Sequence, residues 1–133
     1  MRLAQLALLA SLIPLAACLK PEPKTPSGAE DFADYCSGCH GAGGKGDGPM
    51  AASLGKRPAD LTRLAGANGK IAMAPVMSKI YGATNVHPGD LMPEFGTLLE
   101  SDKVVLYDSG DGIPTPTPLR LVQVAEHIQS LQE

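Results

Sequence analysis

Hydrophobic residues are unevenly distributed along the 133-residue chain, and its two ends show the clearest patterns. Residues 3–15 form an apolar run that only three residues interrupt. Near the other end, apolar residues recur at the spacing of one helix face, namely Leu121, Val124, Ala125, Ile128 and Leu131. This spacing predicts an amphipathic C-terminal helix, for which Thr117 and Pro118 suit the N-cap and the first helical position.

Two more helices are predicted between these segments. Residues 27–30 (Ser-Gly-Ala-Glu) have the form of a capping box, so a helix should begin there and continue until Gly41 ends it. Another should begin at Ala74-Pro75 and end at Gly82. A start at Lys70 is the alternative, and it would leave the proline inside the helix as a kink.

The segment before the C-terminal helix does not follow a helical pattern. Residues 104–107 (Val-Val-Leu-Tyr) are rich in β-branched and aromatic side chains, so 103–107 is predicted to be extended. Turn-forming residues and three prolines follow, and we expect 108–117 to be an insertion loop. Such a loop either docks a partner or is a surface elaboration.

The N-terminal apolar run has the features of a secretory signal. Arg2 supplies a positive charge before it, and the small residues Ala16 and Ala17 follow it. The run is too short for a membrane span. We therefore predict that residues 1–17 are a signal peptide and that the protein is exported.

Residues 15–18 (Leu-Ala-Ala-Cys) resemble the lipobox of bacterial lipoproteins. The resemblance implies cleavage before Cys18 and acylation of that cysteine, with several acyl chains holding the protein firmly on a membrane. The alternative is an ordinary signal that leaves Cys18 as a free thiol. Residues 18–26 would then be the lipidated cysteine and a proline-rich tether that reaches on the order of 25 Å. Whether the membrane is the inner or the outer one stays open.

The net charge of the chain mainly serves to exclude classes of binding partner. The chain has 11 basic and 14 acidic side chains, a net charge of −3 with neutral histidines. Removing the signal, whose only charge is Arg2, changes this to −4. Without a basic patch we expect no nucleic-acid partner. An acidic protein would instead be attracted to a partner with a basic docking face, and salt should weaken that attraction.

Residues 36–40 (Cys-Ser-Gly-Cys-His) carry the chemistry of the chain. Two cysteines two residues apart, followed at once by histidine, are the pattern for covalent attachment of a c-type haem. Thiols one helical turn apart can reach the two vinyl groups on one porphyrin edge, which brings His40 under the iron. Attachment of this kind occurs on the periplasmic side in bacteria, in agreement with the signal peptide.

Three other interpretations of this motif compete. A thioredoxin-like dithiol would need a preceding strand, whereas residues 27–35 look helical. A structural zinc site needs four ligands, and only His87 and His127 remain, far apart in the sequence. A disulfide would not account for His40. His127 lies at the margin of the C-terminal apolar face and is predicted to be a half-buried packing residue.

The second axial position of the iron could be filled by methionine or histidine. Met92 directly precedes a proline in a loop. A loop segment suits a ligand that must approach the iron, because it is not held in a helix or strand. His87 lies in the same loop and is the second candidate. Met73 and Met77 are four residues apart on one helix face, which favours a role in the core.

Four segments resemble class I cytochromes c in their order and approximate spacing: Cys36–Gly41, Gly46–Pro49, Pro58–Thr62 and Met92–Gly96. The match covers about residues 27–98 and the last helix, and it places a cytochrome c domain at 27–133. The resemblance implies an all-α, cytochrome c-like fold around one covalently bound haem. The segment after Leu99 departs from the family and would be a loop or extended insertion.

The same resemblance assigns roles to individual residues. Cys36 and Cys39 would be the thioether links to haem c, with His40 and Met92 as axial ligands of the iron. Pro49 would accept the hydrogen bond from the His40 ring.

These features predict a lipid-anchored periplasmic monohaem cytochrome c that carries single electrons between a membrane-bound donor and acceptor. It would not be an enzyme, because a histidine–methionine haem has no vacant position for a substrate. One alternative is a haem c subunit of a larger oxidase or dehydrogenase. Another is a haem-based enzyme or sensor in which a small molecule displaces Met92.

Overall fold

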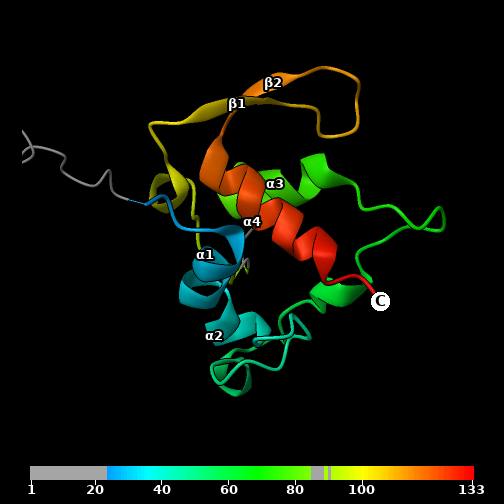
Figure 1. Ribbon diagram of the computed structural model, residues 1–133. Coiled ribbons are helices and arrows are strands. Elements are labelled where there is room, and N and C mark those ends of the chain that lie inside the picture. Colours follow the sequence, from blue (N-terminus) through cyan, green and yellow to red (C-terminus); the bar gives the residue numbers. More distant parts are fainter. Residues whose placement is uncertain (1–23, 85–88, 90) are drawn as a thin grey trace, which may run out of the picture.

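The structure is a computed structural model and describes residues 24–84, 89 and 91–133. Its helices are α1 (Gly28–Tyr35), α2 (Ser37–His40), α3 (Met73–Tyr81) and α4 (Leu119–Ser130), with short 3-10 turns η1 (Ala51–Ser53), η2 (Leu61–Arg63) and η3 (Thr97–Leu99). Strands β1 (Val104–Tyr107) and β2 (Thr115–Pro118) form an antiparallel hairpin. In Figure 1 the hairpin and α2 lie at opposite ends of the packed helices. None of the helices in these ranges has the length and apolar character needed to cross a membrane.

The hairpin overturns the prediction of an all-α fold. Residues 103–107 were expected to be extended, and β1 confirms this for 104–107. The predicted insertion loop at 108–117 is wrong at its end, because Thr115–Pro118 pairs with β1. Prolines lack an amide donor and therefore disguise a strand in the sequence. They are tolerated here because both strands of a two-stranded sheet are edge strands.

Local signals set the ends of the helices. The Ser27 side chain accepts from the Glu30 amide, and the Glu30 carboxylate accepts from the Ser27 amide at 2.7 Å, which is the predicted capping box. Helix α3 begins at Met73, so its proline lies in the first turn, and Gly82 ends it in the left-handed conformation with φ of 104°. Helix α4 has Pro118 as its N-cap, one residue later than predicted.

Helices α1, α3 and α4 enclose the hydrophobic core. The buried residues are Phe32, Cys36, Met73, Met77, Ile80, Leu99, Leu121, Val122, Val124, Ala125 and Ile128. Met73 and Met77 are only 6% and 7% exposed, so their predicted core role is confirmed. The His127 ring is partly buried and lies 5.0 Å from the Phe32 ring, which agrees with a packing role.

Helix α1 packs tightly against the backbone of α4 at Gly28. A β-carbon at this position would overlap the backbone carbonyl of Gln123. We expect Gly28→Ala to lower the free energy of unfolding by about 1–3 kcal/mol, because the two helices must move apart. Denaturant unfolding followed by circular dichroism measures this. Gly55→Ala is the control, since it has no atom within 4 Å of an added β-carbon; an equal loss in both variants would contradict the packing argument.

Candidate functional site

The end of α1 carries the cysteine–histidine motif directly into α2. The Cys36 amide donates to the Phe32 carbonyl and the His40 amide donates to the Cys36 carbonyl, both at 2.9 Å, so helical bonding continues through the junction. Cys36 and Cys39 are therefore one turn apart, as predicted. Both are free thiols; Cys36 is buried and Cys39 is partly buried. The three reactive side chains of the motif share a single short segment.

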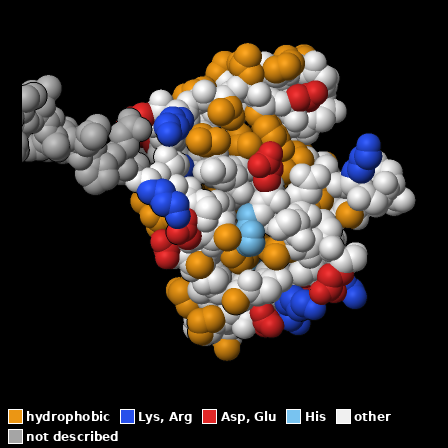
Figure 2. All heavy atoms as spheres, viewed as in Figure 1, with side chains coloured by type: hydrophobic (Ala, Val, Ile, Leu, Met, Phe, Trp, Pro, Cys, Tyr) orange, Lys and Arg blue, Asp and Glu red, His pale blue; other side chains and the backbone are white. Residues whose placement is uncertain are grey.

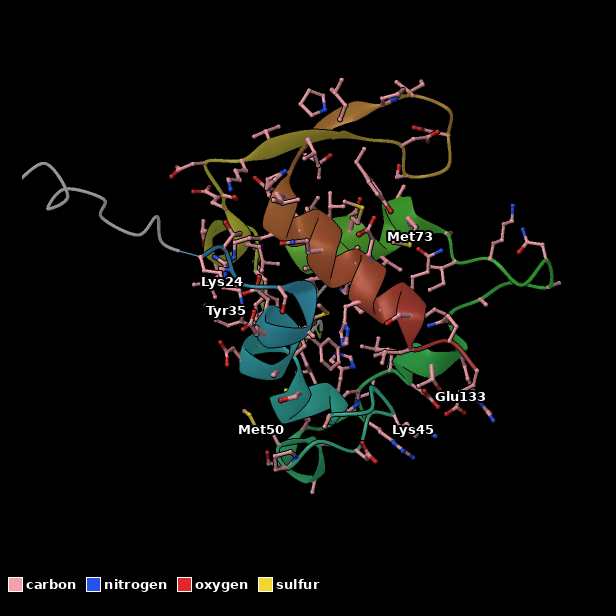
Figure 3. The ribbon with its side chains drawn as sticks, viewed as in Figure 1. Lys24, Tyr35, Lys45, Met50, Met73 and Glu133 are labelled. Atoms are coloured by element: carbon pink, nitrogen blue, oxygen red, sulfur yellow. The ribbon has the colours of Figure 1, made fainter. Side chains whose placement is uncertain are left out.

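The glycine-rich loop after His40 folds back onto α2. Three of its amides donate at 2.8–3.1 Å to carbonyls of the helix, in the pairs Gly46 to His40, Gly48 to Cys39 and Met50 to Gly38. A β-carbon at residue 48 would overlap the carbonyls of Ser37 and Gly38, so only glycine fits there. Figure 3 shows Met50 beside α2. These three hydrogen bonds thus tie the loop to the backbone of the cysteine–histidine motif.

A backbone carbonyl holds the imidazole of His40. Its Nδ1 lies 2.9 Å from the carbonyl oxygen of Ala59. When Nδ1 donates to this oxygen, the lone pair of Nε2 is left to bind a metal. The resemblance implied Pro49 as the acceptor, but in the structure Ala59 accepts, and Pro49 is exposed on the loop. The carbonyl that orients the His40 ring therefore lies ten residues later in the sequence than expected.

One backbone hydrogen bond and two side chains, Arg57 and Gln132, hold the Ala59 segment in place, and the sequence did not predict their role. The Leu61 amide donates to the Gly44 carbonyl at 2.7 Å, and the Arg57 guanidinium donates to the carbonyls of Lys45 and Gly46. From the end of α4, Gln132 Nε2 donates to the Leu61 carbonyl at 2.6 Å. A carbonyl acceptor such as that of Ala59 has no residue-type signal, because every residue offers the same group.

Met92 lies on a segment that packs between the ends of α1 and α3. Its side chain is partly buried against the hydrophobic core. Three residues later, the Phe95 amide donates to the Ile80 carbonyl at 3.0 Å, and the Phe95 ring lies 6.5 Å from that of Tyr35. Tyr35 directly precedes Cys36, so the structure brings the Met92 segment to the motif end of α1. His87 and Cys18, the other two predicted site residues, lie outside the described residues.

The surroundings of the two thiols weaken the competing interpretations of the motif. Burial, and then the nearby charge of Asp31, raises the pKa of the Cys36 thiol to about 11. A catalytic dithiol needs the opposite, a lowered pKa that produces thiolate near neutral pH. The pair also follows a helix rather than a strand. Within residues 24–84, 89 and 91–133, no group of three or more histidine, cysteine, aspartate or glutamate side chains could hold a zinc ion.

The arrangement fits covalent attachment of a haem better than the other chemistry considered. It offers two unpaired thiols one turn apart and, one residue later, an imidazole whose Nε2 is free to bind iron. Comparison with models of known families, with curated proteins and with solved structures gave no match. The function must therefore be inferred from the residues of this chain.

Proposed function

We propose that this protein is a lipid-anchored periplasmic monohaem cytochrome c, similar to class I cytochromes c, that carries single electrons between membrane-bound redox complexes. The observation that carries the proposal is the 2.9 Å contact between His40 Nδ1 and the Ala59 carbonyl, directly after two unpaired cysteines. Cys36 and Cys39 would hold the haem through thioether bonds, and His40 and Met92 would bind its iron. Bound haem c supplies a one-electron Fe(II)/Fe(III) couple.

The residues around the motif have separate roles in this proposal. The Ala59 carbonyl fixes the His40 ring and increases the basicity of its Nε2. The soft thioether of Met92 favours Fe(II), which raises the potential relative to a second imidazole. With His40 and Met92 both binding the iron, no position would be left for a substrate, and the protein would act as a carrier rather than as an enzyme.

The signal peptide and Cys18 support the location in this proposal. Acylation would keep the carrier on a periplasmic membrane surface, within reach of its donor and acceptor. The second candidate is a haem subunit of a larger oxidase or dehydrogenase. It is favoured by the exposed apolar hairpin, where Leu106 is 73% exposed. Stable co-purification through residues 100–118 would support it.

Substituting the axial methionine tests the proposal. In a host that matures haem c, the wild-type protein should be coloured and, when oxidised, should show a methionine–iron charge-transfer band. We expect Met92→Ala to keep its haem, lose this band and have a reduction potential lower by on the order of 0.1 V, a fraction of the roughly 0.8 V range that axial ligands set. Optical spectra and a redox titration measure both effects.

Met50→Ala is the matched control, because Met50 is 54% exposed and lies next to the motif. It should keep both the band and the potential. A wild-type protein without haem would refute the proposed function. A band that persists in Met92→Ala would refute only the assignment of this ligand, and His87→Ala would then be the variant to measure.

A further inference from the structure

The β1–β2 hairpin has one apolar face that nothing in the described structure covers. We call it the hairpin face and define it by Val104 and Leu106 of β1, which are 57% and 73% exposed; Ile113 of the connecting loop is also 65% exposed. Pro116 pairs with Leu106 and extends the apolar surface. In Figure 2, hydrophobic side chains gather over the hairpin. Such a cluster on a small protein indicates a contact surface.

The opposite face of the hairpin fixes it to the rest of the protein. Val105 and Tyr107 alternate with the exposed residues of β1 and pack against the hydrophobic core. The amide after β2, that of Leu119 at the start of α4, donates to the Lys103 carbonyl at 2.9 Å. The hairpin face is therefore presented on a packed element rather than on a loose loop.

The N-terminal segment enters the domain beside the base of this hairpin. One cavity of about 580 Å³ is lined by Lys24, the first described residue, by Lys103 just before β1, and by Pro118 and Arg120 at the start of α4. Figure 1 shows the chain entering on that side. Cys18 lies six residues before Lys24. Six residues of any chain reach no further than about 20 Å when fully extended, so an acylated Cys18 would keep the hairpin side of the domain close to the bilayer.

We infer that the hairpin face lies in the interfacial region of the lipid bilayer that anchors the chain. This inference rests on the lipid anchor of the proposed function. The apolar side chains contact the acyl boundary, while Asp108 and Asp111 of the connecting loop remain among the headgroups and water. The acidic loop favours zwitterionic over anionic lipids. Since α2 lies at the other end of the domain in Figure 1, this contact turns the cysteine–histidine motif away from the bilayer.

A spin label can test the contact on the complete protein. In the matured, acylated protein Cys18, Cys36 and Cys39 are all modified, so Leu106→Cys introduces the only free thiol and can carry a nitroxide. The haem iron is reduced to Fe(II), and the labelled protein is bound to phosphatidylcholine vesicles. We expect the accessibility of the label to oxygen, relative to a water-soluble relaxing agent, to rise several-fold on the vesicles. The same label at Ala52→Cys, on exposed η1 near α2, should not change.

Each outcome of this experiment has a distinct meaning. If the Leu106 label stays in water while the protein remains on the vesicles, the inference is wrong, and the hairpin face is left for a protein partner. If both labels become equally accessible to oxygen, the contact is not specific to the hairpin, which also overturns the inference. If the coloured protein never binds vesicles, the lipid anchor itself is absent, and that result refutes the anchor while leaving the electron-carrier proposal intact.

Exchange between vesicles provides a second readout. The double substitution Leu106→Asp and Ile113→Asp removes two apolar contacts, so the anchored protein should transfer to excess acceptor vesicles about tenfold faster than the wild type. Ala52→Asp should transfer at the wild-type rate. Replacing part of the phosphatidylcholine by phosphatidylglycerol should speed transfer of the wild type. Equal rates for all three proteins on phosphatidylcholine would overturn the inference.

Discussion

Replacing Cys36 and Cys39 together by alanine should produce a chain that retains no haem after denaturing gel electrophoresis. The proposed thioether bonds would survive denaturation, whereas the proposed iron ligation by His40 and Met92 would not. Haem staining of the gel should therefore give a strong band for the wild type and none for the double variant. The thiols are free and one turn apart, so either single substitution should leave one attachment and a weaker band.

The control for this experiment is the third cysteine. Cys18→Ser should give full haem staining, but the protein should move from the membrane fraction to the soluble fraction, because only the proposed acyl chains would be lost. Covalent haem in the double variant would contradict the attachment at the motif. Loss of haem in Cys18→Ser would show that membrane anchoring and haem attachment are not the separate features that we propose.

Replacing Arg120 by leucine should destabilise the protein by about 3–5 kcal/mol, because it leaves a buried carboxylate without its partner. Asp31 is 1% exposed, and Arg120 binds it through two donors, with Nε at 3.0 Å from Oδ2. Arg120 Nη1 also donates to the Leu98 carbonyl at 2.7 Å, so one side chain joins α4 to α1 and to η3. The hydrogen bond to Asp31 also raises the pKa of Arg120, which stays charged.

Denaturant unfolding of the matured protein measures this loss. Arg63→Leu is the matched control, since Arg63 is exposed and should change stability by no more than about 0.5 kcal/mol. The double variant Asp31→Leu, Arg120→Leu should recover part of the loss, because it removes the unpaired charge as well. A double variant less stable than Arg120→Leu, or similar losses at Arg63 and Arg120, would contradict this account of the ion pair.

Features that depend on neighbours three or four residues apart were predictable. The capping box at Ser27, the end of α3 at Gly82 and the buried face of α4 all follow from spacing along one helix. The single turn that separates Cys36 from Cys39 belongs to the same class. In each case the interacting groups lie within about one turn of each other, so the local sequence already contains both partners.

The hairpin shows why the fold class was mispredicted. Strand β1 was recognisable from its own β-branched residues, whereas β2 contains Pro116 and Pro118. These prolines are two residues apart, so their nitrogens face the same side of the strand, and in a two-stranded sheet that side can be the outer edge. The strand exists because β1 pairs with it, and no property of residues 115–118 alone indicates that pairing.

Residue types at short spacing were enough to predict the main helical segments, the haem-type motif and the candidate ligands. Only the folded chain shows that the Ala59 carbonyl, rather than that of Pro49, contacts the His40 ring. The pairing of Asp31 with Arg120, 89 residues away, likewise appears only in the folded chain. These contacts join groups that are distant in the sequence and that only chain folding brings together, and a backbone carbonyl offers the same acceptor whatever its side chain.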